Sequence, residues 1–509
     1  MSRYNFLKKQ KNRIILALAV ALVTTLCGCD MEDIKLSDAL NSSNDITAED
    51  INNAMDNIIH SASMPQEAVN ILKQEVIIDE VSRYPGSESW CVDGQCAPAA
   101  DAQPQDNEVI QDNTEVVEST GAQESGSEAA VAVNNNSSNA SSGMRGIWVA
   151  SVVNIDYPKA GTNDSSVLKA EADAIINNCE ALGMNNIFLQ VRPASDALYK
   201  SDIFPWSKYL TGQQGLAPSN GFDPLEYFIS TAHAKGIKVH AWLNPYRVTK
   251  NNDKNNSEYN ALADNNPAKL HPEYLIKFNG EYYYDPAIPE VRQLVIDGIK
   301  EIVRNYDIDG IHFDDYFYPS GSASGFNDDA SYAVYGGGLS RADFRRDNVN
   351  KLVKSIRGEI RAIDPNCVFG ISPCGIWANN TTTSEGSKTA GMEAYTQLFA
   401  DTRKWVKEEW IDYIAPQVYW EIGHSKADYE TLCYWWANQV KGTSTKLYIG
   451  MGDYRTVGAK SDSVWSGTNM IKRELQLNES IVEISGEIHY NYNSIVGSQG
   501  LSDLYKSYY

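Results

Sequence analysis

From residue 145 to the end of the sequence, short apolar segments alternate with longer stretches of helical pattern. The apolar segments span residues 145–153, 185–193, 236–245, 309–315, 367–373, 411–420, 446–452 and 486–492. Near-continuous apolar strands separated by helices are typical of a parallel sheet that helices cover. Eight such units in 365 residues predict a closed (β/α)8 barrel, the TIM-type α/β fold. An open doubly wound sheet is the alternative, but no glycine-rich phosphate loop follows the first strand.

The sequence divides into three regions. Residues 1–28 are predicted to be a lipoprotein signal peptide, and residues 29–144 an acidic, largely disordered tether that includes a short pair of helices within 45–81. Residues 145–509 form the predicted barrel. Its helices are expected between the strands, at 167–182, 224–235, 288–306, 341–363 and 395–409 among others.

The N-terminal segment is typical of an export signal. Five basic side chains precede an apolar run at 14–26, which is shorter than the ~20 residues of a membrane span. The run ends in Leu26-Cys27-Gly28-Cys29, which resembles a bacterial lipobox and so implies cleavage before Cys29 and acylation of its thiol. We therefore expect an extracytoplasmic protein that Cys29 anchors to the cell membrane. An ordinary signal peptide cut elsewhere is the alternative.

The charge is distributed unevenly along the chain. Residues 29–144 carry three Lys/Arg against 22 Asp/Glu, and the stretch 98–143 contains no Lys, Arg or aromatic residue. Such a composition cannot bury a core, which is why we predict a tether. The barrel region carries 35 Lys/Arg and 44 Asp/Glu. It lacks the excess of basic residues that phosphate binding requires, and we expect no nucleic-acid partner.

The cysteines do not form a disulfide framework. Cys91 and Cys96 enclose a tight Asp-Gly turn and are able to pair with each other, and the sequence leaves that question open. Further zinc ligands are missing near this pair. The remaining cysteines of the mature chain are expected to be free thiols: Cys179, Cys367, Cys374 and Cys433. We expect neither a metal nor a cofactor.

Polar and aromatic side chains gather where the predicted strands end. In a (β/α)8 barrel, functional residues lie on the loops after the carboxyl ends of the strands. In chain order these are Gln190, Arg192, Asp196, Trp242, Asn244, Tyr246, Arg247, His312, Asp314, Asp315, Ser372, Trp377, Gln417, Tyr419, Trp420, Glu421, Asp453, Tyr454, His489 and Asn491. Aromatic faces combined with amide, guanidinium and carboxylate groups predict a cleft that binds a polyol.

Two adjacent acids, Asp314 and Asp315, close the fourth predicted strand. A polar pair at the end of a buried strand costs several kcal/mol unless it is solvated or paired. Side chains alternate along a strand, so His312 and Asp314 share one face and Asp315 takes the other. We predict Asp314 as the primary catalytic carboxylate and Asp315 as a residue that orients a neighbour. A capped turn without chemistry is the alternative.

At this point the sequence resembles a known family. The strings "RGIWV", "QVRPASDALY", "HAWLNPYR", "DGIHFDDYFYP", "FGISPCGIW" and "PQVYW" are similar to those of the glycosyl-hydrolase-like family 10 bacterial lipoproteins. The resemblance spans residues 145–509. It implies a (β/α)8 barrel related to glycosidase barrels, and activity on peptidoglycan glycan strands, particularly strands without stem peptides.

The strand ends depart from the amylase-type pattern in two places. That pattern has an Arg two positions before a nucleophilic Asp, and here His312 stands at the Arg position and Asp314 at the nucleophile position. The fifth strand end, where amylase-type barrels carry an acidic Glu, has no carboxylate. A glycosidase needs a second carboxyl group ~5–5.5 Å from the first if it retains configuration and ~6.5–9.5 Å if it inverts. Glu421 ranks first for that role, before Asp196, Asp453 and Asp315.

The main hypothesis is a lipid-anchored glycoside hydrolase that cleaves cell-wall glycan strands. Asp314 would stabilise or attack the sugar carbon while a second acid protonates the leaving oxygen. The residues predicted to bind substrate are Arg192, Asp196, Asn244, Tyr246, His312, Tyr316, Trp377, Gln417, Tyr419 and Trp420.

Two other hypotheses stay open. A non-catalytic glycan-binding lipoprotein on a degenerate barrel would explain the missing acid of the fifth strand. A metal-dependent hydrolase or deacetylase would need His240, His312 and His489 to gather with Asp314, but the first strand lacks the His-x-His that amidohydrolase barrels use.

Overall fold

The computed structural model describes residues 143–250 and 255–509. The predictions on the signal peptide, on Cys29, on the helical pair, on the tether and on Cys91 and Cys96 lie outside these residues. Among the helices of the described part, none is long and apolar enough to cross a membrane.

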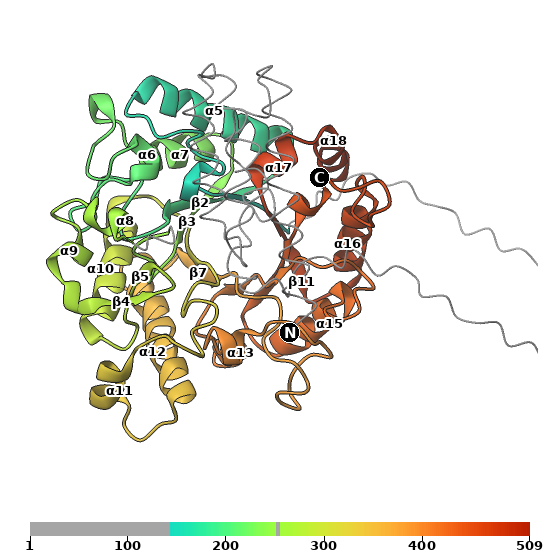
Figure 1. The fold of residues 1–509 in the computed structure, drawn as a ribbon. Helices are drawn as coiled ribbons and strands as arrows, with labels where there is room; N and C mark the ends of the chain where they lie inside the picture. The colour runs from blue at the N-terminus through green and yellow to red at the C-terminus, as the bar shows by residue number, and fades with distance from the viewer. Residues whose placement is uncertain (1–142, 251–254) are drawn as a thin grey trace, which may run out of the picture. The chain divides into compact units, whose positions relative to one another are not determined.

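A closed parallel barrel forms the centre of the described part, which confirms the predicted (β/α)8 fold (Figure 1). Its strands are β1 (Met144–Val149), β2 (Asn186–Arg192), β3 (Lys238–Leu243), β6 (Gly310–Phe313), β7 (Val368–Ile371), β8 (Tyr413–Ile414) with β9 (Gln417–Val418), β10 (Lys446–Met451) and β11 (Ile484–His489). β11 pairs with both β1 and β10, which closes the ring. β8 and β9 share one position of the barrel, because both pair with β10 on either side of Pro416.

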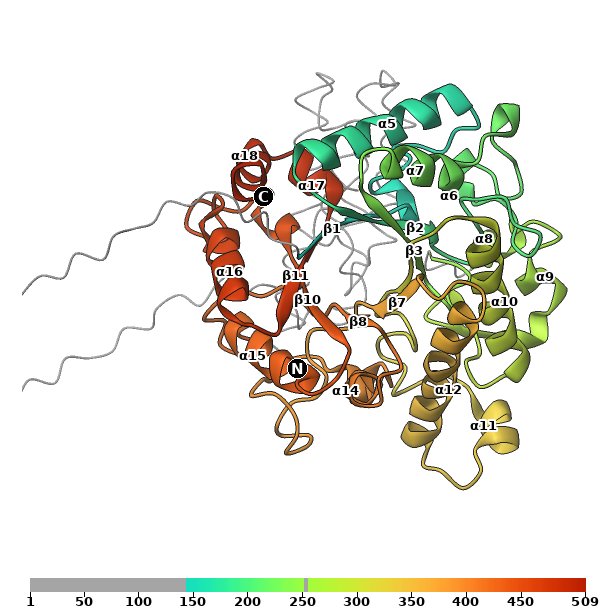
Figure 2. The same ribbon diagram turned by 180° about the vertical axis from the view of Figure 1, so that it is seen from behind.

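Helices surround the barrel, as both views show (Figures 1 and 2). The main ones are α5 (Ser165–Ala181), α7 (Pro224–His233), α10 (Pro289–Asn305), α12 (Arg341–Arg361), α14 (Thr402–Lys407), α15 (Tyr429–Val440), α16 (Asn469–Ser480) and α18 (Gln499–Tyr508). One predicted helix is wrong: 395–409 divides into α13 (Ala394–Gln397) and α14. Phe399 lies between them with a φ of 52°, a left-handed conformation that no helix continues through.

Local sequence signals set where these helices begin. Asp223 accepts hydrogen bonds from the backbone N–H groups of Leu225 and Glu226, and Pro224 occupies the first turn of α7. Ser340 caps α12 by accepting from the N–H of Asp343. In α7 and α12 the capping residue therefore sets the first turn, and the buried apolar residues of the helix follow it.

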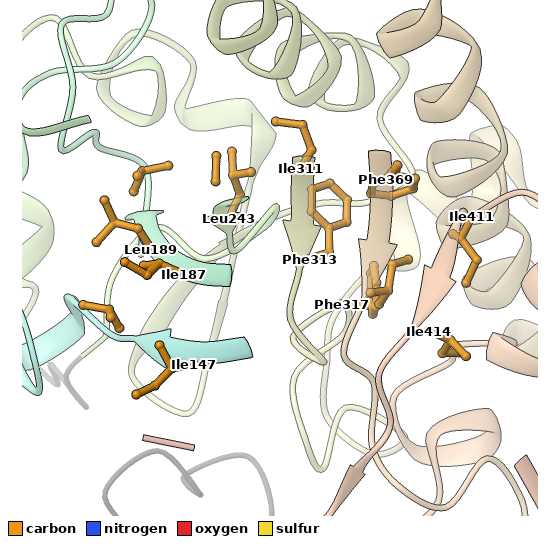
Figure 3. Close-up of a cluster of buried hydrophobic side chains, with 14 of the residues drawn as sticks. Ile147, Ile187, Leu189, Leu243, Ile311, Phe313, Phe317, Phe369, Ile411 and Ile414 are labelled. Atoms are coloured by element: carbon orange, nitrogen blue, oxygen red, sulfur yellow. The ribbon is translucent and has the colours of Figure 1, made fainter. Parts of the chain in front are cut away.

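The outward side chains of the strands form the main hydrophobic core with the helices. Ile147, Ile187, Leu189, Leu243, Ile311, Phe313 and Phe369 come from successive strands and are fully or almost fully buried (Figure 3). Cys179, Cys367 and Cys433 are free thiols, as expected, and they are buried, as is Cys374. This layer holds the strand ends in fixed relative positions.

Large aromatic side chains fill the inside of the barrel. Trp148, Phe188, Trp242 and Tyr413 pack there into one buried cluster with a few smaller side chains. Two strand glycines make room for them. A Cβ on Gly370 would lie 2.1 Å from the ring of Tyr413, and one on Gly310 would lie 2.3 Å from His240, so neither position tolerates a side chain. The interior is a packed core and the chemistry is confined to the strand ends.

Long insertions stand between strands and helices on the carboxyl side. The segment between β3 and α10 contains an antiparallel hairpin of β4 (Leu275–Phe278) and β5 (Glu281–Tyr284), and the segment between β6 and α12 contains α11 (Asp329–Tyr335). The bridge between Arg247 and Tyr283 ties the hairpin to the chain that leaves β3. These insertions bring additional residues to the edge where Asp314 lies.

Candidate active site at the strand ends

Asp314 follows β6 and accepts three hydrogen bonds from surrounding N–H groups. Its Oδ1 accepts from the backbone N–H of Asp315 at 2.8 Å and from Nε2 of Gln417 at 3.1 Å, and its Oδ2 accepts from Nδ2 of Asn244 at 3.3 Å. The side chain is 5 % exposed. The residues that follow β3 and β6 and the first residue of β9 thus meet at one carboxylate. The predicted residues Asn244 and Gln417 are among them.

A chain of amides fixes how Asn244 is oriented. Oε1 of Gln190 accepts from the backbone N–H groups of Ser151 and Val152, both at 2.9 Å, so its Nε2 must face the other way. That Nε2 donates to Oδ1 of Asn244 at 2.7 Å, which leaves Nδ2 of Asn244 to donate to Asp314. Gln190 is one of the strand-end residues, but neither a catalytic nor a substrate-binding role is predicted for it. The alternation of β2 places it on the same face as the interior residue Phe188.

His312 lies inside the barrel, beneath Asp314. Its Nε2 accepts from the indole Nε1–H of Trp148 at 3.1 Å, and its Nδ1 lies 2.9 Å from the hydroxyl of Tyr413. Burial, with a smaller contribution from His240, lowers the pKa of His312 well below its usual value, so the ring is neutral. The predicted substrate-binding role is therefore wrong, because this side chain is fully enclosed by the aromatic interior. The shared inner face of His312 and Asp314 is confirmed.

Three tyrosines form a wall on one side of Asp314. Tyr419 follows β9, Tyr454 follows β10 and Tyr490 follows β11. The rings of Tyr419 and Tyr490 stack with centroids 6.0 Å apart, and Tyr454 meets both edge-on. Burial raises the pKa of the Tyr419 and Tyr490 hydroxyls well above their usual value, with smaller contributions from neighbouring groups that include Asp314. Both phenols stay protonated and are able to donate.

On another side of Asp314, Arg247 lies over the ring of Tyr316. The guanidinium carbon is 4.1 Å from the ring centroid, and Nη1 donates to the backbone carbonyl of Pro193 at 3.3 Å. Tyr316 is partly exposed, as a predicted sugar-binding residue should be. Arg247 is one of the strand-end residues, but no contact with substrate is predicted for it. Its neighbour Tyr246 is the one predicted to bind substrate.

Tyr246 packs away from the cleft, which corrects its predicted substrate-binding role. It belongs to the main hydrophobic core, and its buried hydroxyl has no hydrogen-bond partner among the described residues. Strict alternation after Asn244 would have turned Tyr246 inward, but β3 ends at Leu243 and the rule does not extend into the loop. The structure brings Arg247 to the site in its place.

Arg192 also points away from the cleft. The register shifts between Gln190 and Arg192, and this irregularity turns the side chain to the helix side of the sheet. There the guanidinium lies 3.7 Å from the ring centroid of Phe204, and a Cβ on Gly298 of α10 would meet it. The predicted substrate-binding role is wrong for this residue.

Asp196 is buried in the loop after β2. Its Oδ2 accepts from Nε2 of Gln214 at 3.4 Å and its Oδ1 has no partner in the described part. Burial raises the pKa of Asp196, and hydrogen bonds from Ser207 and Gln214 oppose the rise. A side chain enclosed in this way supports the loop, so its predicted contact with substrate is wrong.

Trp377 lies among the helices that follow β7. Its Nε1 donates to Oδ1 of Asp401 at 3.1 Å, and its ring stacks on Trp435 with centroids 5.8 Å apart. It is 5 % exposed and belongs to the main core. This corrects its predicted role in stacking on sugar. The reason is that β7 ends at Ile371, six residues earlier.

The remaining predicted residues keep their roles as predictions. Asp315 is almost fully buried beside Asp314, and Trp420 is partly exposed next to Gly375. Glu421 is partly exposed too, and its charge helps to raise the pKa of Glu474 on α16, after burial and Asp453. No hydrogen bond in the described part joins the carboxyl group of Glu421 to Asp314.

A second polar cluster lies on the helix side of β10 and β11. Asp453 accepts from the hydroxyl of Tyr505, and its Oδ2 lies 3.1 Å from Nδ1 of His489. Nε2 of His489 lies 2.8 Å from the hydroxyl of Tyr509. The histidines His240 and His312 are inside the barrel, whereas His489 is outside, so the gathering that a metal-dependent hydrolase requires does not form. No group of three or more metal-ligating side chains occurs among the described residues.

Asp156, in the loop after β1, is a buried carboxyl group that sequence reasoning missed. It accepts from the backbone N–H groups of Ala150 and Asn493 and from Nδ2 of Asn491. Burial raises the pKa of Asp156 to about 7, although these hydrogen bonds oppose the rise. Asp156 ties the loop after β1 to the loop after β11, which carries Tyr490. A single Asp in a loop gave no signal of this.

Two solved structures are similar to this chain at low sequence identity. The glycoside hydrolase domain of PgaB from Bordetella bronchiseptica is 14% identical, covers 71% of this chain and 98% of its own, and has a TM-score of 0.49. An endo-β-1,4-mannanase from Thermotoga petrophila is 13% identical, covers 65% of this chain and 67% of its own, and has a TM-score of 0.40.

Curated relatives are much more similar in sequence. "Glycosyl hydrolase YngK" of Bacillus subtilis (strain 168) is 41% identical over 356 residues, which are 69% of this chain and 68% of the relative. "Glycosyl hydrolase DigH" of Escherichia coli (strain K12) is 40% identical over 362 residues, 68% of this chain and 82% of the relative. The sequence pattern of the family described as glycosyl hydrolase-like 10 matches residues 143–467, from β1 to the residues before α16. The chain therefore belongs to the glycosyl hydrolase-like 10 family.

Proposed function

We propose that this protein is a lipid-anchored glycoside hydrolase that cleaves cell-wall glycan strands, in particular peptidoglycan strands without stem peptides. The observation that carries the proposal is the carboxylate of Asp314, held at the centre of the strand ends by Asn244 and Gln417. Membership of the family and the names of the relatives support hydrolysis of glycosidic bonds. The lipobox-like Leu26–Cys29 segment supports the anchor.

In this proposal Asp314 acts on the sugar carbon. Three N–H donors face its two oxygens, so the group is fixed in position before substrate arrives. It attacks the anomeric carbon or stabilises the positive charge that develops there as the leaving oxygen departs. The tyrosine wall and Tyr316 offer apolar faces and hydroxyl donors on either side, as binding of sugar rings requires.

A second carboxyl group protonates the leaving oxygen. Glu421 and Asp315 remain the candidates for this general acid, and they differ in exposure, since Glu421 is partly open and Asp315 is almost fully buried. A general acid contributes about 10²- to 10⁴-fold to the rate. The loss of activity in Glu421→Gln and Asp315→Asn therefore distinguishes the acid from a residue that only orients Asp314.

The test is the appearance of new reducing ends. The full chain with Cys29→Ala, which blocks lipidation, is incubated with peptide-free peptidoglycan strands and with the same strands before their stem peptides are removed. We expect the Cys29→Ala protein to produce new reducing ends from the peptide-free strands. The same protein that also carries Asp314→Asn should produce none. Strands that stay intact with wild type would contradict the proposal.

A non-catalytic glycan-binding protein is the second candidate, and one observation favours it. The residue at the carboxyl end of β7 is Ser372, whose hydroxyl lies 2.9 Å from Nε2 of His312, so this strand end brings no carboxylate to the site. Binding of peptide-free strands without new reducing ends, unchanged by Glu421→Gln, would support this candidate.

A further inference from the structure

Arg247 is a buried cation without a counter-ion. The residue is 4 % exposed, and within the described part of the chain its guanidinium makes one hydrogen bond, from Nη1 to the carbonyl of Pro193 at 3.3 Å. Within residues 143–250 and 255–509 it forms no ion pair. A guanidinium carries five N–H donors in a planar fork, so most of the donors of Arg247 are unused. Buried donors in this condition lack the hydrogen bonds that they form in water, and a ligand that accepts from them restores these bonds.

Other buried arginines of the described part differ from Arg247 in the partners and the enclosure of their guanidinium groups. Arg345 pairs with Asp328 through Nε and Nη2, both at 2.8 Å, and also donates to two backbone carbonyls. Arg192 has two unpartnered nitrogens, Nε and Nη1, but packing seals both from solvent. The free nitrogens of Arg247 are not sealed in this way, since none is among the fully enclosed polar atoms. Arg247 therefore keeps donors that are buried but not completely enclosed.

The position of Arg247 places these donors beside the catalytic carboxylate. Its guanidinium lies over Tyr316, which follows Asp314 by two residues, and it stands three residues after Asn244, which donates to Asp314. Burial lowers the pKa of Arg247, but Tyr316, Glu281, Tyr283 and Asp314 outweigh burial and the net direction is upward. The guanidinium is charged at every physiological pH, and the ring of Tyr316 keeps its plane fixed.

We propose that Arg247, held over Tyr316, forms a subsite that recognises a carboxylate on the sugar next to the bond that is cleaved. This inference rests on the proposed function and deepens it. One sugar of a peptidoglycan strand carries a lactyl ether whose carboxyl group is amide-bonded to the stem peptide. Removal of the peptide turns that neutral amide into a free carboxylate. The planar fork of Arg247 pairs with two carboxylate oxygens at once, so it distinguishes strands without peptides from strands that carry them.

Binding is the experiment, because it does not depend on turnover. The full chain with Cys29→Ala and Asp314→Asn is titrated by calorimetry with soluble peptide-free glycan fragments. The second ligand is the same fragments after their carboxyl groups are converted to methylamides. A charge-assisted pair is expected to make the free acid bind about 10- to 100-fold more tightly. Adding Arg247→Gln should reduce this preference to about twofold or less, and Arg247→Lys should retain part of it, since lysine keeps the charge without the fork.

Arg346 supplies the matched control. Its guanidinium lies 4.1 Å from the ring centroid of Tyr395, the same distance as in the Arg247 pair, but on α12. Arg346→Gln should leave the preference for the free acid unchanged. Thermal unfolding of each variant shows that it is folded. If Arg247→Gln does not fold, Arg247→Lys decides, because the proposal then requires the preference to fall without disappearing.

The proposal is overturned if the free acid and the methylamide bind equally to protein with Arg247, if neither binds, or if the preference persists in Arg247→Gln. New reducing ends from wild type are counted separately on both ligands. A carboxylate preference without turnover would contradict the proposed hydrolase and leave the subsite intact. Turnover without the preference would contradict the subsite alone.

Discussion

Two buried aspartates at the carboxyl ends of strands have opposite surroundings. Asp314, after β6, accepts from two side-chain amides and one backbone N–H, and it lies on the inner face with Asn244 and Gln417. Asp453, after β10, contacts Tyr505 and His489 on the outer face, where α18 covers it. Asp314 is 5 % exposed and Asp453 is 0 % exposed.

The difference shows that the face of the sheet decides the role of a strand-end residue. On the inner face a polar side chain lies beside the ends of other strands, and those strands supply its hydrogen-bond partners. On the outer face the same type of residue meets a helix and is sealed. The family pattern matches residues 143–467, which include Asp314 with Asn244 and Gln417 but, of the outer cluster, only Asp453.

The sharpest test of the comparison is Asp314→Asn. Because asparagine keeps the shape and loses the charge, we expect turnover on peptide-free strands to fall by about 10³-fold or more, while the thermal midpoint of unfolding stays the same or rises. Initial rates of reducing-end formation and a melting curve measure the two quantities. A variant that keeps most of its activity would remove Asp314 from the mechanism.

Asp453→Ala should have the opposite effect. It leaves the buried groups of Tyr505 and His489 without their partner, so we expect the free energy of unfolding to fall by about 3 kcal/mol and the rate per folded molecule to stay constant. Denaturant titration measures the loss. Asp503→Ala, at an exposed acid on α18, is the control and should change stability by less than about 0.5 kcal/mol. Lost turnover in folded Asp453→Ala would show that the outer cluster serves catalysis.

Gln417→Ala tests whether the amides position Asp314. It removes the donor to Oδ1 and the bond of Nε2 to the carbonyl of Ser372 at 2.9 Å. We expect kcat to fall by about 10- to 100-fold with a smaller change in KM, because the loss concerns orientation of the carboxylate and not binding of sugar. Steady-state kinetics separate the two constants, and an effect on KM alone would assign Gln417 to substrate binding.

The smallest effect concerns pH and the outer face. Burial raises the pKa of Glu487 to about 7, although His489, Asn478 and Tyr509 oppose the rise. At pH values between 4.5 and about 7, the carboxyl group of Glu487 is therefore protonated in the folded state and ionised in the unfolded state. Stability contributed by this group is present at low pH and is lost as pH rises through about 7.

Glu487→Gln should remove that dependence. Between pH 6 and pH 7 we expect wild type to lose about 1 kcal/mol more unfolding free energy than the variant does. Other buried carboxyl groups contribute equally to both proteins and cancel in the difference. Chemical denaturation at the two pH values measures it. Identical slopes would mean that Glu487 is already ionised in the folded protein.

Much of the fold followed from pattern. All eight strands were predicted because each is an apolar run bounded by helical periodicity, and alternation correctly put His312 and Asp314 on one inner face. The single wrong helix, 395–409, failed because the left-handed turn at Phe399 leaves no mark in residue type.

The site was predicted less well, and the errors have a common cause. Asn244, Asp314 and Gln417 lie within one or two residues of a strand, where alternation still applies. Tyr246 and Trp377 lie beyond it, and Arg192 follows a shift in register. In each of these positions the direction of the side chain depends on the path of the loop and not on its place in a two-residue period.

By itself, the sequence determined the eight-unit barrel, the edge where the strand-end polar residues gather and the place of Asp314 among them, since these depend on periodicity that neighbouring residues share. Only the tertiary structure decided which side of the sheet each strand-end residue faces. It enclosed His312, turned Arg192 and Tyr246 outward, sealed Asp453 beneath α18 and brought Arg247 over Tyr316. The physical reason is that these positions result from contacts between segments that are distant in the sequence, such as Asp453 with Tyr505 and Arg247 with Tyr316, which no local pattern contains.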